Sequence, residues 1–289
     1  MKRIASIAPF IFALFLPLAS HAATISIYPD AIIQGDPVII SIIGTSTVKS
    51  ISFGGQKLPV TIYNGKPTAF YGFDLNKKTG VFKISAILSD NTLLEKNILV
   101  DRREKAVVSF TIPLKLGGNT KASQTKLVST LSDENAGLLG LKTGVKAFWS
   151  EPFIFPVKDA TTTDTYGYSR DTGSVTVAHK GTDFRAAEGT SVMAINNGIV
   201  RLTRETRNYG KTIVIDHGQG IMSLYMHLSK IYVVPGEYVI QGQVIGLSGK
   251  TGYAESPHIH LSLRIKDISI DPEVFLGYFR NATSSYSFP

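Results

Sequence analysis

Short runs of alternating or wholly apolar residues, separated by turn residues, fill the first part of the chain from Thr24 to about Leu114. PVIISIIG, VFKISAIL and AVVSFTI are examples, and Asn64-Gly65 is typical of a tight turn. Several short strands at this spacing predict an immunoglobulin-like β-sandwich over residues 23–116. This part contains no histidine and no cluster of acidic residues, so we expect a spacer or binding module.

The pattern changes twice further along the chain. SQTKLVSTLSDENAGLLGL is rich in Ser, Thr and Lys and places Leu at loosely helical intervals, which predicts a linker with short helices over residues 117–146. The β pattern then returns, dense in glycine, and predicts a second domain over residues 147–279. Residues 280–289 are predicted to form a tail. The fold class expected for the whole chain is therefore mainly β.

The start of the chain has the features of an export signal. Lys2 and Arg3 precede a short apolar run that contains two prolines, and Ser20-His21-Ala22 places small residues at a cleavage site. We interpret residues 1–22 as a secretory signal peptide. No later apolar segment is long enough to span a membrane. The expected protein is exported, either periplasmic or secreted and cell-wall associated, with no membrane span after signal cleavage.

Composition narrows the chemistry. The 289 residues include no cysteine, which excludes disulfides, thiolate zinc sites and cysteine nucleophiles. Removing Lys2 and Arg3 lowers the formal charge from +8 to +6. A basic exported protein suits an anionic polymer of the cell envelope, and no nucleic-acid partner is expected. Ordinary surface charge explains the excess equally well.

Histidines are concentrated in the second half of the chain. Five remain after the signal peptide: His179, His217, His227, His258 and His260. In SPHIHLSLRI, His258 and His260 fall on one face of a predicted strand. His217 lies in a turn, DHGQG, and is interpreted as an ordinary packed side chain. Two imidazoles and the carboxylate of Asp183 would suit Zn²⁺ with a fourth position open for water, although spacing alone leaves the choice among the other four histidines open.

The order H-x-x-x-D, then a histidine before Leu-Ser, then H-x-H resembles the lysostaphin/LytM-type zinc metalloendopeptidases, over roughly Tyr166 to Arg264. The resemblance implies an antiparallel β-sheet with a zinc-containing groove and hydrolysis of peptide cross-links in bacterial peptidoglycan by zinc-activated water. It implies one Zn²⁺ per chain held by His179, Asp183 and His260, with His258 as general base and His227 polarising the substrate or stabilising the oxyanion.

Some positions depart from the family pattern. Leu261 and Ser262 replace a frequent Phe-Glu after the H-x-H pair, and the usual Phe-Gly-x-Arg before the first ligand is loosened to YGYSR. With Ser262 in place of glutamate, the chain lacks a carboxylate that the family pattern often has near the ligands. Leu261 is expected to face the core, where Leu in place of Phe is tolerable.

Three functions remain open at this stage. An endopeptidase acting on peptidoglycan is favoured because all five residues that the resemblance implies are present. A LytM-like domain without activity would bind the wall or activate another hydrolase, and a third possibility is a protease of extracellular proteins. The connector could also cover the groove and donate an oxygen to the metal from Asn119 or Asn135. The pattern specifies neither the oligomeric state nor which cross-link is cut.

Overall fold

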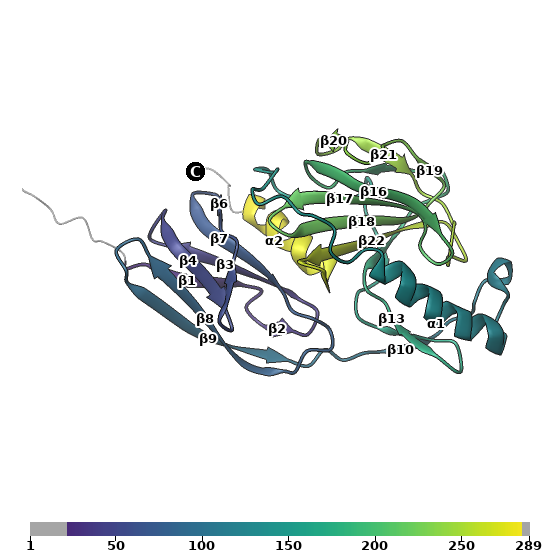
Figure 1. Cartoon of the computed structure of the whole chain (residues 1–289), viewed down its shortest axis with the longest axis horizontal. Helices are drawn as coiled ribbons and strands as arrows, with labels where there is room; N and C mark the ends of the chain where they lie inside the picture. Colours follow the sequence, from purple (N-terminus) through teal and green to yellow (C-terminus); the bar gives the residue numbers. More distant parts are fainter. Residues whose placement is uncertain (1–21, 285–289) are drawn as a thin grey trace, which may run out of the picture.

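Strands outnumber helices in residues 22–284, the part of the chain that the computed structural model describes (Figure 1). The mainly β fold class is therefore confirmed. The predicted signal peptide, apart from Ala22, lies outside the described residues, as do the last five residues of the predicted tail. Within residues 22–284, no helix combines the length and apolarity needed to cross a membrane.

Two sheets face each other in the N-terminal part. The four-stranded sheet has the order β1 (Thr24–Tyr28), β3 (Pro37–Ile43), β7 (Lys66–Gly72) and β6 (Thr61–Tyr63). The five-stranded sheet has the order β2 (Ile32–Ile33), β9 (Leu93–Asp101), β8 (Gly80–Leu88), β4 (Val48–Phe53) and β5 (Gln56–Leu58). Ile40 and Tyr71 of the first sheet share one apolar cluster with Phe53, Ile84 and Val100 of the second. The immunoglobulin-like type and the domain boundaries stay predictions.

An eight-stranded antiparallel sheet dominates the C-terminal part. Its order is β11 (Thr162–Asp164), β14 (Thr182–Arg185), β22 (His258–Ile265), β18 (Ile221–Leu228), β17 (Gly210–Gly218), β16 (Gly198–Thr206) and β20 (Tyr238–Val239), with β23 (Ile268–Ile270) beside β22. A smaller sheet contains β15 (Ser191–Met193), β21 (Val244–Leu247) and β19 (Lys230–Ile231). Ile259, Leu261 and Leu263 are fully buried in the core. Period-two alternation turns the even-numbered residues of β22 to the opposite face of the sheet.

The connector lies against this opposite face. Over the predicted range 117–146 it contains α1 (Lys121–Ala136), a single helix longer than those expected from sequence, and β10 (Val107–Ser109) and the short η1 (Leu114–Leu116) precede it. β10 pairs in parallel with β12 (Ser169–Asp171), which pairs with β13 (Thr176–Ala178). Glu134 of α1 accepts hydrogen bonds from the backbone N–H groups of Asn208 and Tyr209, so a buried carboxylate anchors the helix to the large sheet.

The C-terminal helix α2 (Pro272–Ser284) lies between the two parts (Figure 1). Because it continues past Arg280, residues 280–284 of the predicted tail are helical. Aromatic contacts cross the junction: the ring of Trp149 lies 5.7 Å from Phe70 of β7 and 5.6 Å from Phe279 of α2. One apolar core thus contains residues of both parts.

Candidate metal and catalytic site

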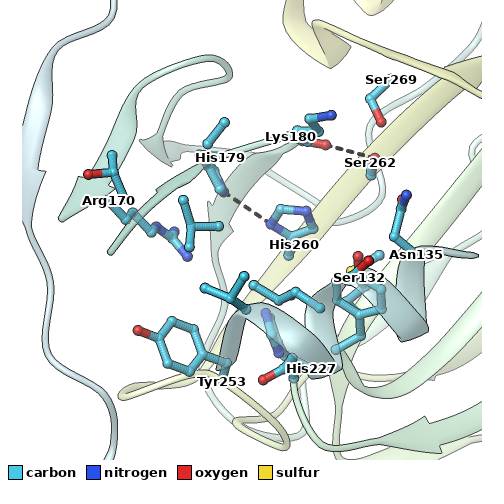
Figure 2. A pocket seen from close by; sticks show the side chains of 18 of the residues that line it. Ser132, Asn135, Arg170, His179, Lys180, His227, Tyr253, His260, Ser262 and Ser269 are labelled. Atoms are coloured by element: carbon cyan, nitrogen blue, oxygen red, sulfur yellow. Dashed lines mark hydrogen bonds between the residues drawn. The ribbon is translucent and has the colours of Figure 1, made fainter. Parts of the chain in front are cut away.

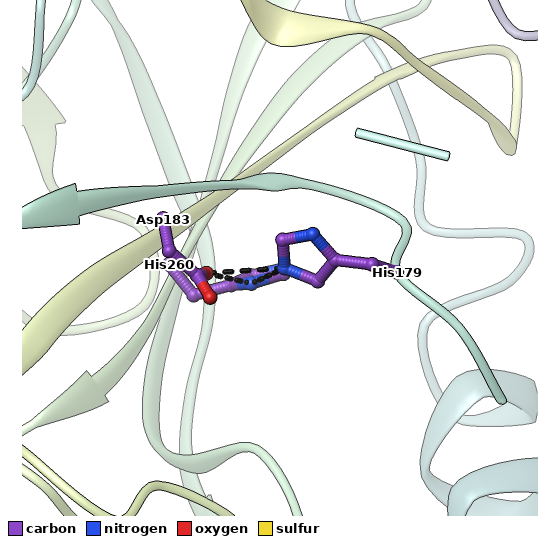
Figure 3. A group of neighbouring side chains, drawn as sticks. All are labelled: His179, Asp183 and His260. Carbon is purple, nitrogen blue, oxygen red and sulfur yellow. Dashed lines mark hydrogen bonds and ion pairs between the residues drawn. The ribbon is translucent and has the colours of Figure 1, made fainter. Parts of the chain in front are cut away.

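Three potential metal ligands converge where β13, β14 and β22 meet (Figure 3). Asp183 of β14 is the direct antiparallel partner of His260 of β22, and His179 follows the end of β13. Asp183 Oδ1 lies 3.1 Å from His179 Nε2 and 2.7 Å from His260 Nδ1, and the two nitrogens are 3.1 Å apart. All three side chains are buried, so they form a compact set of donors largely removed from solvent.

The hydrogen bonds behind these atoms determine what the cluster can bind. His179 Nδ1 lies 2.7 Å from the carbonyl oxygen of Thr165, which can only accept, so this nitrogen carries the proton. In the tautomer with the hydrogen on Nδ1, Nε2 directs a lone pair toward the carboxylate oxygen and the other imidazole. A group of lone pairs facing one another in a buried space favours a cation at its centre. The cluster thus fits a metal ion.

The charge state of the donors agrees with this fit. Burial raises the pKa of Asp183, but the charges and hydrogen bonds of His179 and His260 outweigh that effect and hold its pKa well below the usual range. Burial lowers the pKa of His260 to about 4 despite the neighbouring Asp183. A carboxylate and imidazoles are the donor set typical of zinc sites.

Arg170 is a site residue that the sequence analysis did not identify. Its Nη2 donates to Asp183 Oδ2 over 2.7 Å, its Nε donates to the hydroxyl of Tyr168 over 2.7 Å, and its guanidinium lies 4.7 Å from the ring centre of Phe110. The contact occupies the outer oxygen of Asp183 and leaves the inner one toward the histidines. The only signal was the arginine of the loosened YGYSR motif.

Gly181 makes the close approach of β14 and β22 possible. A Cβ at this position would overlap Nε2 of His260 and lie 2.6 Å from the carbonyl oxygen of Leu261. Any side chain would push His260 away from Asp183. The glycine of HKGTD is therefore a requirement of the cluster's geometry.

His258 lies beside the cluster without being one of its three converging groups. Its Nδ1 lies 2.9 Å from the carbonyl oxygen of Ser256 and carries the proton, which leaves a lone pair on Nε2. Nε2 is buried without a hydrogen-bond partner and lies 3.8 Å from Asp183 Oδ2. This is the arrangement of a proton acceptor held in place by a backbone carbonyl.

A β-bulge places His227. Lys211 and Ile213 of β17 pair with Leu228 and Tyr225 of β18, so that two residues of β18, Met226 and His227, oppose one residue of β17. His227 has a positive φ of 63°, and the bulge turns it toward the cluster, 4.9 Å from the ring centre of His258. Regular alternation would place it on the other face.

The proton of His227 is also assigned by a backbone carbonyl. Its Nδ1 lies 2.9 Å from the oxygen of Thr251 and therefore carries the hydrogen. Burial, followed by the neighbouring His258 and His260, lowers the pKa of His227 well below its ordinary value. The neutral ring consequently has a lone pair on Nε2.

A cavity of about 380 Å³ extends from the histidines under α1 (Figure 2). Asn135 lines it, but its Oδ1 accepts a hydrogen bond from Arg264 over 2.8 Å. Oδ1 of Asn119 accepts from the backbone N–H of Ile112 over 2.8 Å. Both amide oxygens accept from these donors, and neither residue is one of the three whose ligand atoms converge.

His217 is an ordinary packed histidine, as its sequence context suggested. It is fully buried, its Nδ1 donates to the carbonyl of Asn197 over 2.8 Å, and its Nε2 accepts from the hydroxyl of Ser223 over 2.7 Å. Both ring nitrogens are occupied within the fold. Burial lowers the pKa of this imidazole to about 4 from its ordinary value of 6.5.

His217 is expected to make the fold sensitive to acid. The unfolded chain takes up a proton at this residue below pH 6.5, whereas the folded chain does so only near pH 4. Stability should therefore fall as the pH drops through this window, with about 3 kcal/mol due to His217. Urea unfolding of wild type and His217→Gln at pH 7 and pH 4.5 measures the difference. An equal loss of stability in both proteins would contradict the prediction.

Comparison with known proteins places this site in a family. Residues 177–272 match the profile of Peptidase family M23. Peptidoglycan DD-endopeptidase ShyA of Vibrio cholerae is 46% identical over 88 residues, which are 30% of this chain and 20% of ShyA. DD-carboxypeptidase/endopeptidase Mpg of Neisseria gonorrhoeae is 36% identical over 94 residues, 32% of this chain and 22% of Mpg. The chain thus matches about a fifth of the length of these relatives.

The likeness to a solved structure extends over more of the chain. A crystal structure from Pseudomonas aeruginosa, described as a candidate M23 peptidase, superposes with a TM-score of 0.61 at 25% sequence identity. The match covers 86% of this chain and 96% of that one. The resemblance inferred from the histidine motifs is therefore confirmed.

Proposed function

Because its C-terminal domain belongs to peptidase family M23, we propose that the chain is an exported zinc endopeptidase that hydrolyses peptide cross-links of bacterial peptidoglycan. The observation that carries this proposal is the convergence of three buried ligand atoms next to an imidazole whose Nε2 lacks a partner. The activities named for ShyA and Mpg support peptidoglycan as the substrate. Export rests on the N-terminal signal predicted from the sequence.

We assign the metal to His179, Asp183 and His260. Bound zinc would act there as a Lewis acid and lower the pKa of water to about 7. The carbonyl of Thr165 and the guanidinium of Arg170 hold the outer atoms of His179 and Asp183, so these two ligands are oriented before the ion binds.

We assign proton transfer to His258. The carbonyl of Ser256 keeps the hydrogen on Nδ1, so Nε2 is ready to take a proton from the attacking water and later to give it to the leaving amine. The same carbonyl stabilises the imidazolium that forms in between. The second carboxylate oxygen of Asp183, 3.8 Å from Nε2, favours that positive charge.

His227 is assigned the place beside the substrate carbonyl. The hydrogen bond from Nδ1 to Thr251 fixes its ring, and the ring centre of His258 lies 4.9 Å away. In this place His227 would form part of the polar surroundings in which an oxyanion develops. The bulge of β18 holds His227 in this position at the cost of a left-handed backbone conformation.

Hydrolysis of purified peptidoglycan tests this function. The mature chain loaded with zinc should release soluble peptides, detected by liquid chromatography, and a chelator should stop release until zinc is restored. Casein serves as a parallel substrate, because its cleavage in preference to peptidoglycan would favour the protease of extracellular proteins. A chain that binds one zinc and the wall but releases nothing would establish the alternative of an inactive wall-binding or activating domain.

A further inference from the structure

The cavity under α1 has a one-sided charge. It joins the metal cluster at one end, where His179, His227 and His260 line it. Three cationic side chains, Arg170, Lys180 and Arg264, also belong to its lining, whereas no aspartate or glutamate of the described residues does. A space of this kind next to a reactive centre favours a ligand that carries negative charge.

Arg264 is the buried cation of this lining, and no carboxylate of the described part of the chain lies within ion-pair distance of it. Its side chain is only 5% exposed, and Nη2 donates to Asn135 Oδ1. Nε and Nη1 have no hydrogen-bond partner, and none of the ion pairs formed within residues 22–284 involves this guanidinium. Asp267 acts on this guanidinium from beyond ion-pair distance, and a buried guanidinium without a direct anionic partner is costly, because it has lost water without gaining a close anion.

The strand explains why Arg264 has no direct ion-pair partner. His258, His260, Ser262 and Arg264 alternate along β22 and share one face of the sheet. Ser262 stands where the family pattern often has glutamate, and its hydroxyl donates to the carbonyl of Lys180 over 2.8 Å. Nothing on this face of β22 neutralises Arg264.

The remaining walls indicate what else a ligand would contact. Val128 and Leu131 of α1 and Met226 of β18 add apolar side chains to the lining of the cavity. Four residues of strand separate the α-carbons of His260 and Arg264, about 13 Å. This distance can be spanned by two side chains together. One is an extended substrate side chain that enters from the cluster, and the other is the side chain of Arg264.

We propose that this cavity is a substrate subsite for a side chain with an aliphatic stem and a terminal carboxylate, and that Arg264 binds the carboxylate. The inference rests on the proposed function and deepens it, because it specifies which cross-link peptides are cleaved. The apolar walls contact the stem, and the guanidinium forms charge-assisted hydrogen bonds with the terminal group. A peptide with an amide in place of the carboxylate fills the same space but leaves Arg264 unpaired.

Two synthetic cross-link peptides test the subsite, identical except that one side chain ends in a carboxylate or in a carboxamide. Wild type loaded with zinc should cleave the acid with a kcat/KM about 10- to 100-fold higher than the amide. Arg264→Gln should bring the two values within about threefold of each other. Lys230→Gln, which removes a cation outside the cavity, should keep the preference.

A second variant leaves Arg264 in place. Ser262→Glu puts a carboxylate two residues away on the same strand face, where it should pair with the guanidinium and abolish the preference even if Arg264→Gln fails to fold. The subsite is refuted if wild type cleaves acid and amide equally well, or if a folded Arg264→Gln or Ser262→Glu keeps the wild-type preference.

Binding separates the subsite from the proposed function. Calorimetric titration of His258→Ala with each peptide reports recognition without cleavage. Tighter binding of the acid, lost in the double variant with Arg264→Gln, supports the subsite even if wild type cleaves neither peptide, in which case only the proposed function fails. If wild type cleaves both peptides equally well, the proposed function stands and the subsite fails.

Discussion

His260→Ala is expected to remove both the bound zinc and the hydrolysis of peptidoglycan. His260 Nδ1 lies 2.7 Å from Asp183 Oδ1 and 3.1 Å from His179 Nε2, so alanine takes away one of three converging donors. Two protein ligands are fewer than a catalytic zinc site uses. We expect kcat/KM to fall by about a thousandfold or more, since loss of mere supporting contacts already costs about 10- to 100-fold. Elemental analysis after dialysis and peptide release measure the two effects.

A variant of a buried histidine outside the cluster serves as the control for His260→Ala. His217 is a fully buried histidine of the same sheet, but it contacts Asn197 and Ser223 instead of the cluster. His217→Gln should retain about one zinc per chain and most of the activity at pH 7. If His260→Ala retains stoichiometric zinc while remaining folded, the assignment of the ligands is wrong.

The two histidines of the final active-site strand show how far the sequence could predict the site. Alternation placed His258 and His260 on one face and Ile259 and Leu261 on the other, and the register of β22 agrees. Successive side chains of a strand point to opposite faces, so the face of each residue could be assigned from the sequence alone. Which nitrogen keeps its lone pair depends on the carbonyl of Ser256 for His258 and on the carbonyl of Thr165 for His179, and the spacing of histidines contains no information about these.

His227 shows why the remainder could not be predicted. The alternating run SLYMHLS assigns His227 to the core face with Tyr225, yet the bulge opposite Thr212 turns it to the face of Met226. A bulge depends on pairing between strands and leaves no local signal in this run. Arg170 was missed for a related reason, because its contact with Asp183 joins two segments through tertiary packing. The length of α1 was also underestimated, since its helix is anchored by the tertiary hydrogen bonds of Glu134.

His258→Ala is expected to separate metal binding from catalysis. The three converging donors remain, so about one zinc per chain should be retained, whereas the group assigned to accept the proton of the attacking water is gone. Loss of a general base costs about 10²- to 10⁴-fold in kcat. Peptide release and metal content, measured on the same preparation, test the two halves of this expectation together.

The two alanine variants should differ because the ring nitrogens of His258 and His260 point to different places. His260 directs Nδ1 at the carboxylate within the cluster, while Nε2 of His258 stands 3.8 Å from the outer oxygen of Asp183 and has no partner. His258→Gln can still donate to the carbonyl of Ser256 but cannot take up a proton at neutral pH, so it should fold, bind zinc and be as slow as His258→Ala. Added imidazole should restore part of the rate to the alanine variant. Loss of zinc from both variants would instead make His258 a metal ligand, and an unchanged rate would transfer the role of base to His227.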